Sequence, residues 1–243
     1  MFQNITMKQS IYHAFIQVME QNMTTAHASG RLSDGREFLK LVSVTQVTKA
    51  AHINRRTFYT YFHDIYDLFD HLEDYYVSGL SQSFHGWEDQ DDSMKAVIQS
   101  IGDAVDYMSE NRRGIKLVST IDTLVFPNLI QKEITDAINV TGGLFNRGKL
   151  GADPTKDREW NLNYTIIFLT SGFAWVCYHW MLHPDDFPKD KLKEEFASTF
   201  MGAYKLIQSD QLLTSDQMQA YFREHSTVHA KVDAESHCDS QIS

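Results

Sequence analysis

The segment 55–62 combines side chains that can bind DNA with two phenylalanines suited to a protein core. Phe58 and Phe62 are four residues apart, so in a helix they point to the same side. The residues left largely on the other side are Arg56, Thr57, Tyr59 and Thr60. Arginine can bind guanine through two hydrogen bonds, and threonine can contact a base edge or a thymine methyl group. Tyrosine hydroxyls and the backbone N–H groups at a helix start can bind phosphates. This spacing therefore indicates a helix suited to the major groove of DNA.

A second short helix and a tight turn must position that helix. Residues 44–51 have apolar side chains spaced for one buried face, and Ser43 with Gln46 three residues later is a capping-box start. Residues 52–54 form the turn, and Asn54 is a favourable N-cap for the helix that follows. The alternative is an ordinary helical hairpin with a solvated arginine face, because helix-turn-helix patterns are common in all-α proteins.

The same stretch resembles the DNA-binding domain of TetR-type (TetR/AcrR) transcriptional repressors. The matching residues are Val44-Thr45-Gln46-Val47, Ala50-Ala51, Ile53-Asn54, Thr57-Phe58-Tyr59, Tyr61-Phe62 and Leu68. Two positions depart from the family pattern. His52 stands where the family has glycine, and a residue there needs φ > 0, which histidine tolerates better than most. Ile65 stands where the family has a lysine that contacts phosphate.

The resemblance implies a ligand-responsive repressor that binds a near-palindromic double-stranded DNA operator as a homodimer. A small-molecule effector bound to the body would shift the two DNA-binding heads apart. Lys8, near the start of the first helix, is placed where it could reach a phosphate. The residues predicted to contact DNA are Lys8, Ser43, Thr45, Asn54, Arg55, Arg56, Thr57, Tyr59, Thr60 and Tyr61.

The charge of the chain is unevenly distributed. The 243 residues carry a net charge of −10, which by itself argues against nucleic acid. Residues 1–63, however, have seven Lys and Arg against three Asp and Glu, a net charge of +4. Residues 64–243 have fifteen against twenty-nine, a net charge of −14. A basic head on an acidic body suits a DNA-binding protein whose body is kept away from the phosphates.

Few prolines and glycines and 42% hydrophobic residues predict a well-buried, all-α protein. We expect a three-helix head with the helix-turn-helix over residues 1–70 and a larger helical bundle for dimerisation and ligand binding over 71–225. Residues 226–243 form a polar tail that we expect to be disordered. The first helix should start at Thr6 or Ser10. The later expected helices span residues 65–81, 93–110, 112–120, 128–140, 162–182 and 189–208.

Residues 22–42 are longer than the link that the family resemblance leads us to expect. They contain two glycines and the basic residues Arg31, Arg36 and Lys40. A solvated loop is the main interpretation. The alternative is a basic arm that reaches DNA, as such arms do elsewhere.

The apolar run at residues 162–182 is long enough to span a membrane, but its polar residues favour a helix buried in a bundle. Its Gly-Phe-Ala-Trp grouping, followed by residues 189–208, also resembles the TetR body. The resemblance implies that these two helices pack against their copies in a dimer. Leu192, Phe196 and Phe200 lie on the stripe of the second helix expected there.

Aromatic residues are dense in the second half of the chain and could line an apolar ligand cavity, although plain core packing is the alternative. The residues predicted to line that cavity are Tyr164, Phe168, Trp175 and His179.

Other chemistry has little support. Cys177 and Cys238 are far apart and predict neither a disulfide framework nor a metal site, which suits the reducing cytoplasm. His179 and His183 are spaced i, i+4 and could bind a metal or haem, which makes a haem- or metal-binding sensor or carrier the alternative function. The sequence places no third ligand, so we predict no metal site and no cofactor. A helical enzyme is disfavoured because no acid–base constellation is visible.

Overall fold

The computed structural model describes residues 6–28, 35–84, 93–140, 156–183 and 185–208. For a few residues near helix ends, and for 156–166, that description covers the backbone alone. Within these ranges the chain forms nine α-helices and one 3-10 helix, and no strand. Their bounds are α1 Met7–Ala28, η1 Gly35–Leu41, α2 Val44–Ala50, α3 Arg55–Tyr61, α4 Ile65–Ser83, α5 Ser93–Glu110, α6 Arg112–Ile121, α7 Val125–Val140, α8 Lys156–Leu182 and α9 Lys189–Gln208. The all-α class expected from the sequence is therefore confirmed.

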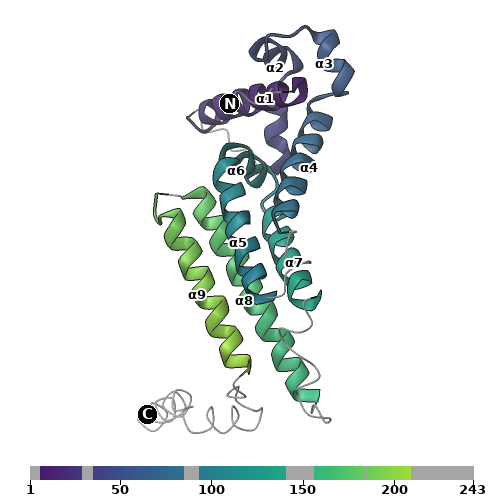
Figure 1. Cartoon of the computed structure of the whole chain (residues 1–243). Helices are drawn as coiled ribbons and strands as arrows, with labels where there is room; N and C mark the ends of the chain where they lie inside the picture. Colours follow the sequence, from purple (N-terminus) through teal and green to yellow (C-terminus); the bar gives the residue numbers. More distant parts are fainter. Residues whose placement is uncertain (1–5, 29–34, 85–92, 141–155, 184, 209–243) are drawn as a thin grey trace, which may run out of the picture.

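The N-terminal helices α1, α2 and α3 form a head at one end of the molecule (Figure 1). The Thr6 hydroxyl accepts from the Gln9 N–H at 3.3 Å, and the Gln9 side chain accepts from the Thr6 N–H at 2.9 Å. This reciprocal capping explains why α1 begins at Met7. The helix packs against α2, η1 and α6. Its core side chains include Ile11, Tyr12, Phe15, Val18 and Met19.

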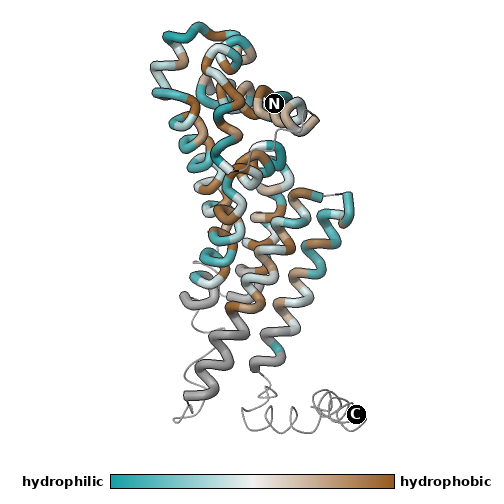
Figure 2. Tube along the Cα trace, turned by 180° about the vertical axis from the view of Figure 1, so that it is seen from behind, coloured by the Kyte–Doolittle hydropathy of each residue, from teal (hydrophilic) through white to brown (hydrophobic). Residues whose placement is uncertain are grey.

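α4 runs from the head into the body, and α5 contacts every helix from α4 to α9 (Figure 1). Hydrophobic and hydrophilic residues alternate along the body helices, as expected for helices that bury one side in a bundle (Figure 2). Asp64 caps α4 by accepting from the Asp67 N–H at 2.8 Å. The helix is continuous through residue 70, so the domain boundary there remains a prediction.

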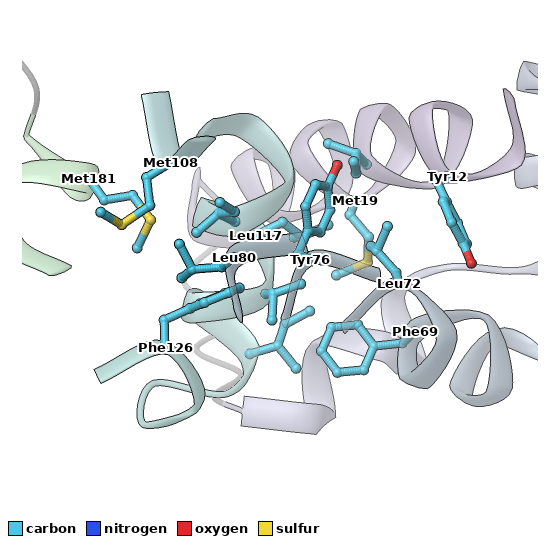
Figure 3. Close-up of a cluster of buried hydrophobic side chains, with 14 of the residues drawn as sticks. Tyr12, Met19, Phe69, Leu72, Tyr76, Leu80, Met108, Leu117, Phe126 and Met181 are labelled. Atoms are coloured by element: carbon cyan, nitrogen blue, oxygen red, sulfur yellow. The ribbon is translucent and has the colours of Figure 1, made fainter. Parts of the chain in front are cut away.

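One contiguous core joins head and body (Figure 3). Met19 of α1, Leu72 and Tyr76 of α4 and Leu117 of α6 all belong to it. Burial raises the pKa of Tyr76 to about 12. Gly114 lets the Tyr76 ring approach α6 closely, because a Cβ at residue 114 would lie 2.0 Å from the ring and its hydroxyl. α4 and α6 are therefore packed together at a site that admits no extra methyl group.

The bounds of two body helices, 93–110 and 189–208, agree with the sequence prediction, and α4 runs two residues beyond it. α7 begins at Val125 and α8 at Lys156, both earlier than expected. No helix in the described part of the chain combines the length and apolar character that crossing a bilayer requires. The tail expected at 226–243 lies outside the described residues.

The prediction of a solvated loop at residues 22–42 is wrong where the structure describes it. Residues 22–28 continue α1, and residues 35–41 form η1. Phe38 and Leu39 of η1 are buried in the core, which ties the segment to the head. A short 3-10 helix gives no helical periodicity in the sequence, so two buried side chains were not enough to reveal it.

Two glycine-to-alanine substitutions should have opposite effects on stability. At Gly114 the new methyl group meets the Tyr76 ring, and overpacking of this kind costs about 1–3 kcal/mol. At Gly102, inside α5, an added Cβ has nothing within 4 Å, and alanine is the better helix former by roughly 0.5–1 kcal/mol. Urea unfolding should therefore show a lower midpoint for Gly114→Ala and a higher one for Gly102→Ala. A midpoint for Gly114→Ala equal to or above that of the parent would contradict the described packing.

Candidate nucleic-acid interface

The helix-turn-helix begins at a capping box on α2. The Ser43 N–H donates to the Gln46 Oε1 at 2.9 Å, and the Gln46 N–H donates to the Ser43 Oγ at 3.4 Å. Both hydrogen bonds satisfy backbone donors that a helix start leaves unpaired. The capping box predicted from the sequence is confirmed.

The turn after α2 depends on the backbone of His52. This residue has φ = 55°, the left-handed conformation that glycine adopts most readily. The sequence had indicated that a residue at this position needs φ > 0, and the structure confirms it. The Ile53 N–H donates to the Thr48 carbonyl at 3.0 Å, which closes the turn.

α3 is held by its cap and by two buried rings. The Asn54 Oδ1 accepts from the Thr57 N–H at 2.8 Å, so the predicted N-cap is confirmed. Phe58 and Phe62 are buried with ring centroids 5.7 Å apart, and Phe62 also packs against Tyr12 of α1 at 5.9 Å. The opposite face of α3 is therefore turned toward solvent.

Two arginines on α3 are exposed but differ in their contacts. The Arg55 guanidinium donates to the Tyr59 Oη at 3.3 Å and lies 6.0 Å from the centroid of the Tyr59 ring. The Arg56 guanidinium makes no hydrogen bond or ion pair with any described residue. Tyr59 is 49% exposed. Arg55 and Tyr59 thus form a preorganised pair, while the Arg56 side chain remains available for an outside partner.

The smaller polar residues in the predicted set use their side chains to fix the helices. The Ser43 and Thr57 hydroxyls donate to the Gln46 and Asn54 side-chain oxygens at 2.9 and 3.1 Å. The Thr60 hydroxyl donates to the Arg56 carbonyl at 3.1 Å. These groups can still accept hydrogen bonds, so contact with DNA remains a prediction for them.

The other residues predicted to contact DNA differ in how exposed their side chains are. Thr45 is exposed on α2, and Tyr61 is half-buried and packs against the core. Lys8 is exposed, and its Nζ lies 5.9 Å from the centroid of the Phe62 ring. This contact brings the start of α1 to the end of α3. The structure therefore places the predicted residues in one head.

Lys49 is an exposed basic residue that the predicted set omitted. It lies four residues after Thr45, on the same side of α2. This spacing was visible in the sequence and could have identified it.

Two basic residues of segment 22–42, Arg36 and Lys40, form ion pairs with acidic residues of the same chain. Arg36 forms an ion pair with Asp70 at 2.9 Å and lies 5.5 Å from the centroid of the Phe69 ring. Lys40 pairs with Glu37 at 2.6 Å. Arg31 lies outside the described residues. The arm interpretation is therefore unsupported for Arg36 and Lys40, since each already has an acidic partner.

Three of the four residues predicted to line a ligand cavity lie on the surface of α8. Phe168 is 77% exposed, Trp175 is 48% exposed, and His179 is also exposed. The side chain of Tyr164 lies outside the described residues. Phe168 borders an open groove of about 240 Å³ between α8 and α9. These side chains point away from the bundle, so they do not enclose a cavity within it.

Two further sequence predictions concern α8 and α9. His179 and His183 lie with ring centroids 4.8 Å apart, and no third His, Cys, Asp or Glu joins them to form a metal-binding group in the described part of the chain.

Phe196 and Phe200 of α9 are buried against Phe173 of α8, at centroid distances of 4.0 and 5.7 Å. The described part of the α9 stripe, Leu192, Phe196 and Phe200, is thus buried within one chain rather than offered to a partner. The side chains of Ala203, Tyr204 and Ile207, which the sequence also placed on this stripe, lie outside the described residues.

Comparison with known proteins establishes a likeness of fold. No family model matches the chain, and no curated protein matches it. The solved structure of the dihydroxyacetone kinase operon activator DhaS aligns with a TM-score of 0.53 and 15% identity, covering 84% of this chain and 98% of that chain. The fatty acid degradation regulator FadR from Bacillus halodurans aligns with a TM-score of 0.46 and 12% identity, covering 83% and 97%. At this identity, the DhaS alignment shows that the two chains share an all-helical fold.

The turn geometry can be tested at residue 52. His52→Gly removes the Cβ that disfavours φ = 55°, and should raise the free energy of unfolding by up to about 1 kcal/mol. His52→Val introduces a β-branched residue for which this conformation is strained, and should lower the free energy of unfolding by about 1–2 kcal/mol. Urea unfolding followed by circular dichroism measures both. Equal stabilities for the two variants would contradict a left-handed residue 52.

Proposed function

We propose that this protein is a transcriptional regulator that binds a near-palindromic operator as a homodimer, with α3 in the major groove. The observation that carries the proposal is the exposed polar face of α3 on a fully capped helix-turn-helix. Two buried phenylalanines fix that face, and two arginines, a tyrosine and a threonine project from it. A short helix with this composition is suited to major-groove contacts.

Within α3, the two arginines take different roles. Arg56 has no intramolecular partner among the described residues, so it is the residue we assign to a base, with guanine as the preferred partner. Arg55 is held against Tyr59 and is assigned to the phosphate backbone. Lys8 and Lys49 are further phosphate contacts. The net charge of +4 over residues 1–63 favours approach of this end of the chain to DNA.

The dimer is proposed to form through the exposed face of α8. Ile167, Phe168, Trp175 and Val176 are large apolar side chains, each between 48% and 77% exposed. Phe168, Trp175 and Val176 recur on one side of the helix. Phe168 and Val176 also line the groove between α8 and α9. An apolar patch of this kind marks an interaction surface, and a two-fold pair is the commonest way to cover one. The proposed dimer places its two α3 helices roughly 34–36 Å apart, so that each can enter one of two successive major grooves.

The direction of regulation and the effector rest on resemblance. The DhaS structure, whose fold this chain shares, is named as an operon activator. The helix-turn-helix residues resemble those of TetR-type repressors, so we propose repression in the cytoplasm, relieved by a small-molecule effector bound to the body. Transcription from a regulated promoter, measured with and without the protein, distinguishes repression from activation.

Substitution of Arg56 tests the assigned base contact. Arg56→Ala should weaken binding to the preferred DNA sequence by roughly 1–3 kcal/mol and relax the preference at one base position. Lys191→Ala is the matched control, because it removes one positive charge from an exposed ion pair on α9, far along the chain from α3. Equilibrium binding at one fixed salt concentration measures both. If Arg56→Ala binds as tightly and as selectively as Lys191→Ala, the assignment is wrong.

Substitution of Phe168 tests the dimer face. Phe168→Glu places a charge on a side chain that is 77% exposed in the single chain, so the monomer fold should survive. Self-association should be lost, and operator affinity with it, because burying an unpaired charge is costly. Leu124→Glu is the control, since Leu124 is 52% exposed in the α6–α7 turn. Sedimentation velocity should give a monomer for Phe168→Glu and a dimer for Leu124→Glu. A dimeric Phe168→Glu would rule out this face.

A further inference from the structure

The last turn of α8 brings two imidazole rings together on the surface. His179 and His183 are both exposed, and their ring centroids are 4.8 Å apart with an angle of 39° between the ring planes. Histidines at i and i+4 of a helix project from the same side, the spacing with which helical metal sites place two nitrogen ligands on one ion. His183 is the first residue after α8, and its N–H donates to the His179 carbonyl at 3.0 Å, so a helical hydrogen bond maintains this spacing.

The two imidazole rings contact each other but have no polar partner among the described residues. Neither imidazole makes a hydrogen bond or ion pair with a described residue. His71 of α4 gives the contrast, because its ring packs on Phe62 at 5.6 Å and lies 3.7 Å from an Asp67 oxygen. The nitrogen atoms of His179 and His183 are therefore available to a ligand from solvent.

The electrostatic surroundings favour a cation at this pair. α8 ends at Leu182, so both histidines lie at the C-terminal end of a helix, where the helix dipole favours positive charge. Asp185 and Asp186 follow directly and are exposed. The Asp186 N–H donates to the His183 carbonyl at 3.2 Å, so the acidic turn folds back toward the second histidine.

We propose that His179 and His183 bind a divalent transition-metal ion, with Cu²⁺ bound more tightly than Ni²⁺ and Ni²⁺ more tightly than Mg²⁺. Imidazole nitrogen is a preferred ligand of copper and nickel, whereas Mg²⁺ prefers oxygen. No third His, Cys, Asp or Glu completes a metal-binding group in the part of the chain that the structure describes. Water fills the remaining positions, and because His179 lies on the same side of α8 as Trp175, the ion lies next to the proposed dimer face. The proposal is independent of DNA binding.

Trp175 provides a spectroscopic readout for this site. It lies four residues before His179 on the same side of α8 and is 48% exposed. A paramagnetic ion held by the two histidines lies within a few side-chain lengths of this indole and quenches its fluorescence. The signal therefore reports binding at this place on the protein rather than binding in general.

The experiment titrates the full chain with NiSO₄ in a buffer free of chelators, following tryptophan fluorescence and, by equilibrium dialysis, the number of ions bound. The test variant is the double substitution His179→Ala with His183→Ala. The matched control is His225→Ala with His229→Ala, because these residues have the same spacing in the sequence outside the described residues. MgSO₄ is the ion control, and EDTA reverses true binding.

We expect Ni²⁺ to quench the parent and the His225/His229 variant alike, with recovery on EDTA, and Mg²⁺ to have no effect. The His179/His183 variant should bind Ni²⁺ at least about tenfold more weakly, and each single substitution should also weaken binding. Trp175→Phe should keep the bound ion and reduce the quenching, with the remainder coming from Trp180, which follows His179 in the sequence. Unchanged affinity and quenching in the His179/His183 variant, or loss of both only in the His225/His229 variant, would overturn the proposal.

Discussion

The proposed DNA-binding face depends on the burial of Phe58 and Phe62. Both rings are almost fully removed from solvent, and Phe62 contacts Tyr12 of α1. Burying a phenylalanine side chain contributes about 1.5–3 kcal/mol, more than any single surface contact of α3 supplies. The inward face of α3 is therefore set by packing. The orientation of Arg55, Arg56 and Tyr59 follows as a consequence.

The head that carries α3 is tied to the body by apolar packing and by polar contacts. α4 is one continuous helix from the head into the bundle, and α1 of the head packs against α6. Arg113 of α6 forms an ion pair with Glu20 of α1 at 2.6 Å, and the neighbouring Arg112 donates to the Met181 carbonyl of α8 at 3.3 Å. A displacement of α8 or α6 would therefore reach α1 through direct contacts. Such contacts would be needed if, as proposed, an effector bound to the body controls DNA binding by the head.

Much of the fold could be predicted because the sequence carries local signals. The caps at Ser43 and Asn54 and the apolar periodicity of residues 93–110 identify helices without tertiary information. The buried face of α8 could not be predicted, because apolar residues surround the whole helix and no pattern indicates which side is covered. Phe168 and Trp175 were consequently expected in a cavity and lie on the surface, while Phe200 was expected at a dimer face and lies inside. Which face of an all-round apolar helix is covered depends on tertiary packing.

Selection of bound fragments from a random pool of double-stranded DNA tests the central claim most directly. We expect enrichment of one motif with two inverted half-sites whose centres are separated by about 10–10.5 base pairs or a multiple of that distance. That result would match two copies of α3 presented by a two-fold dimer. Recovery of no enriched motif from a folded, full-length protein at moderate salt would contradict sequence-specific DNA binding by α3.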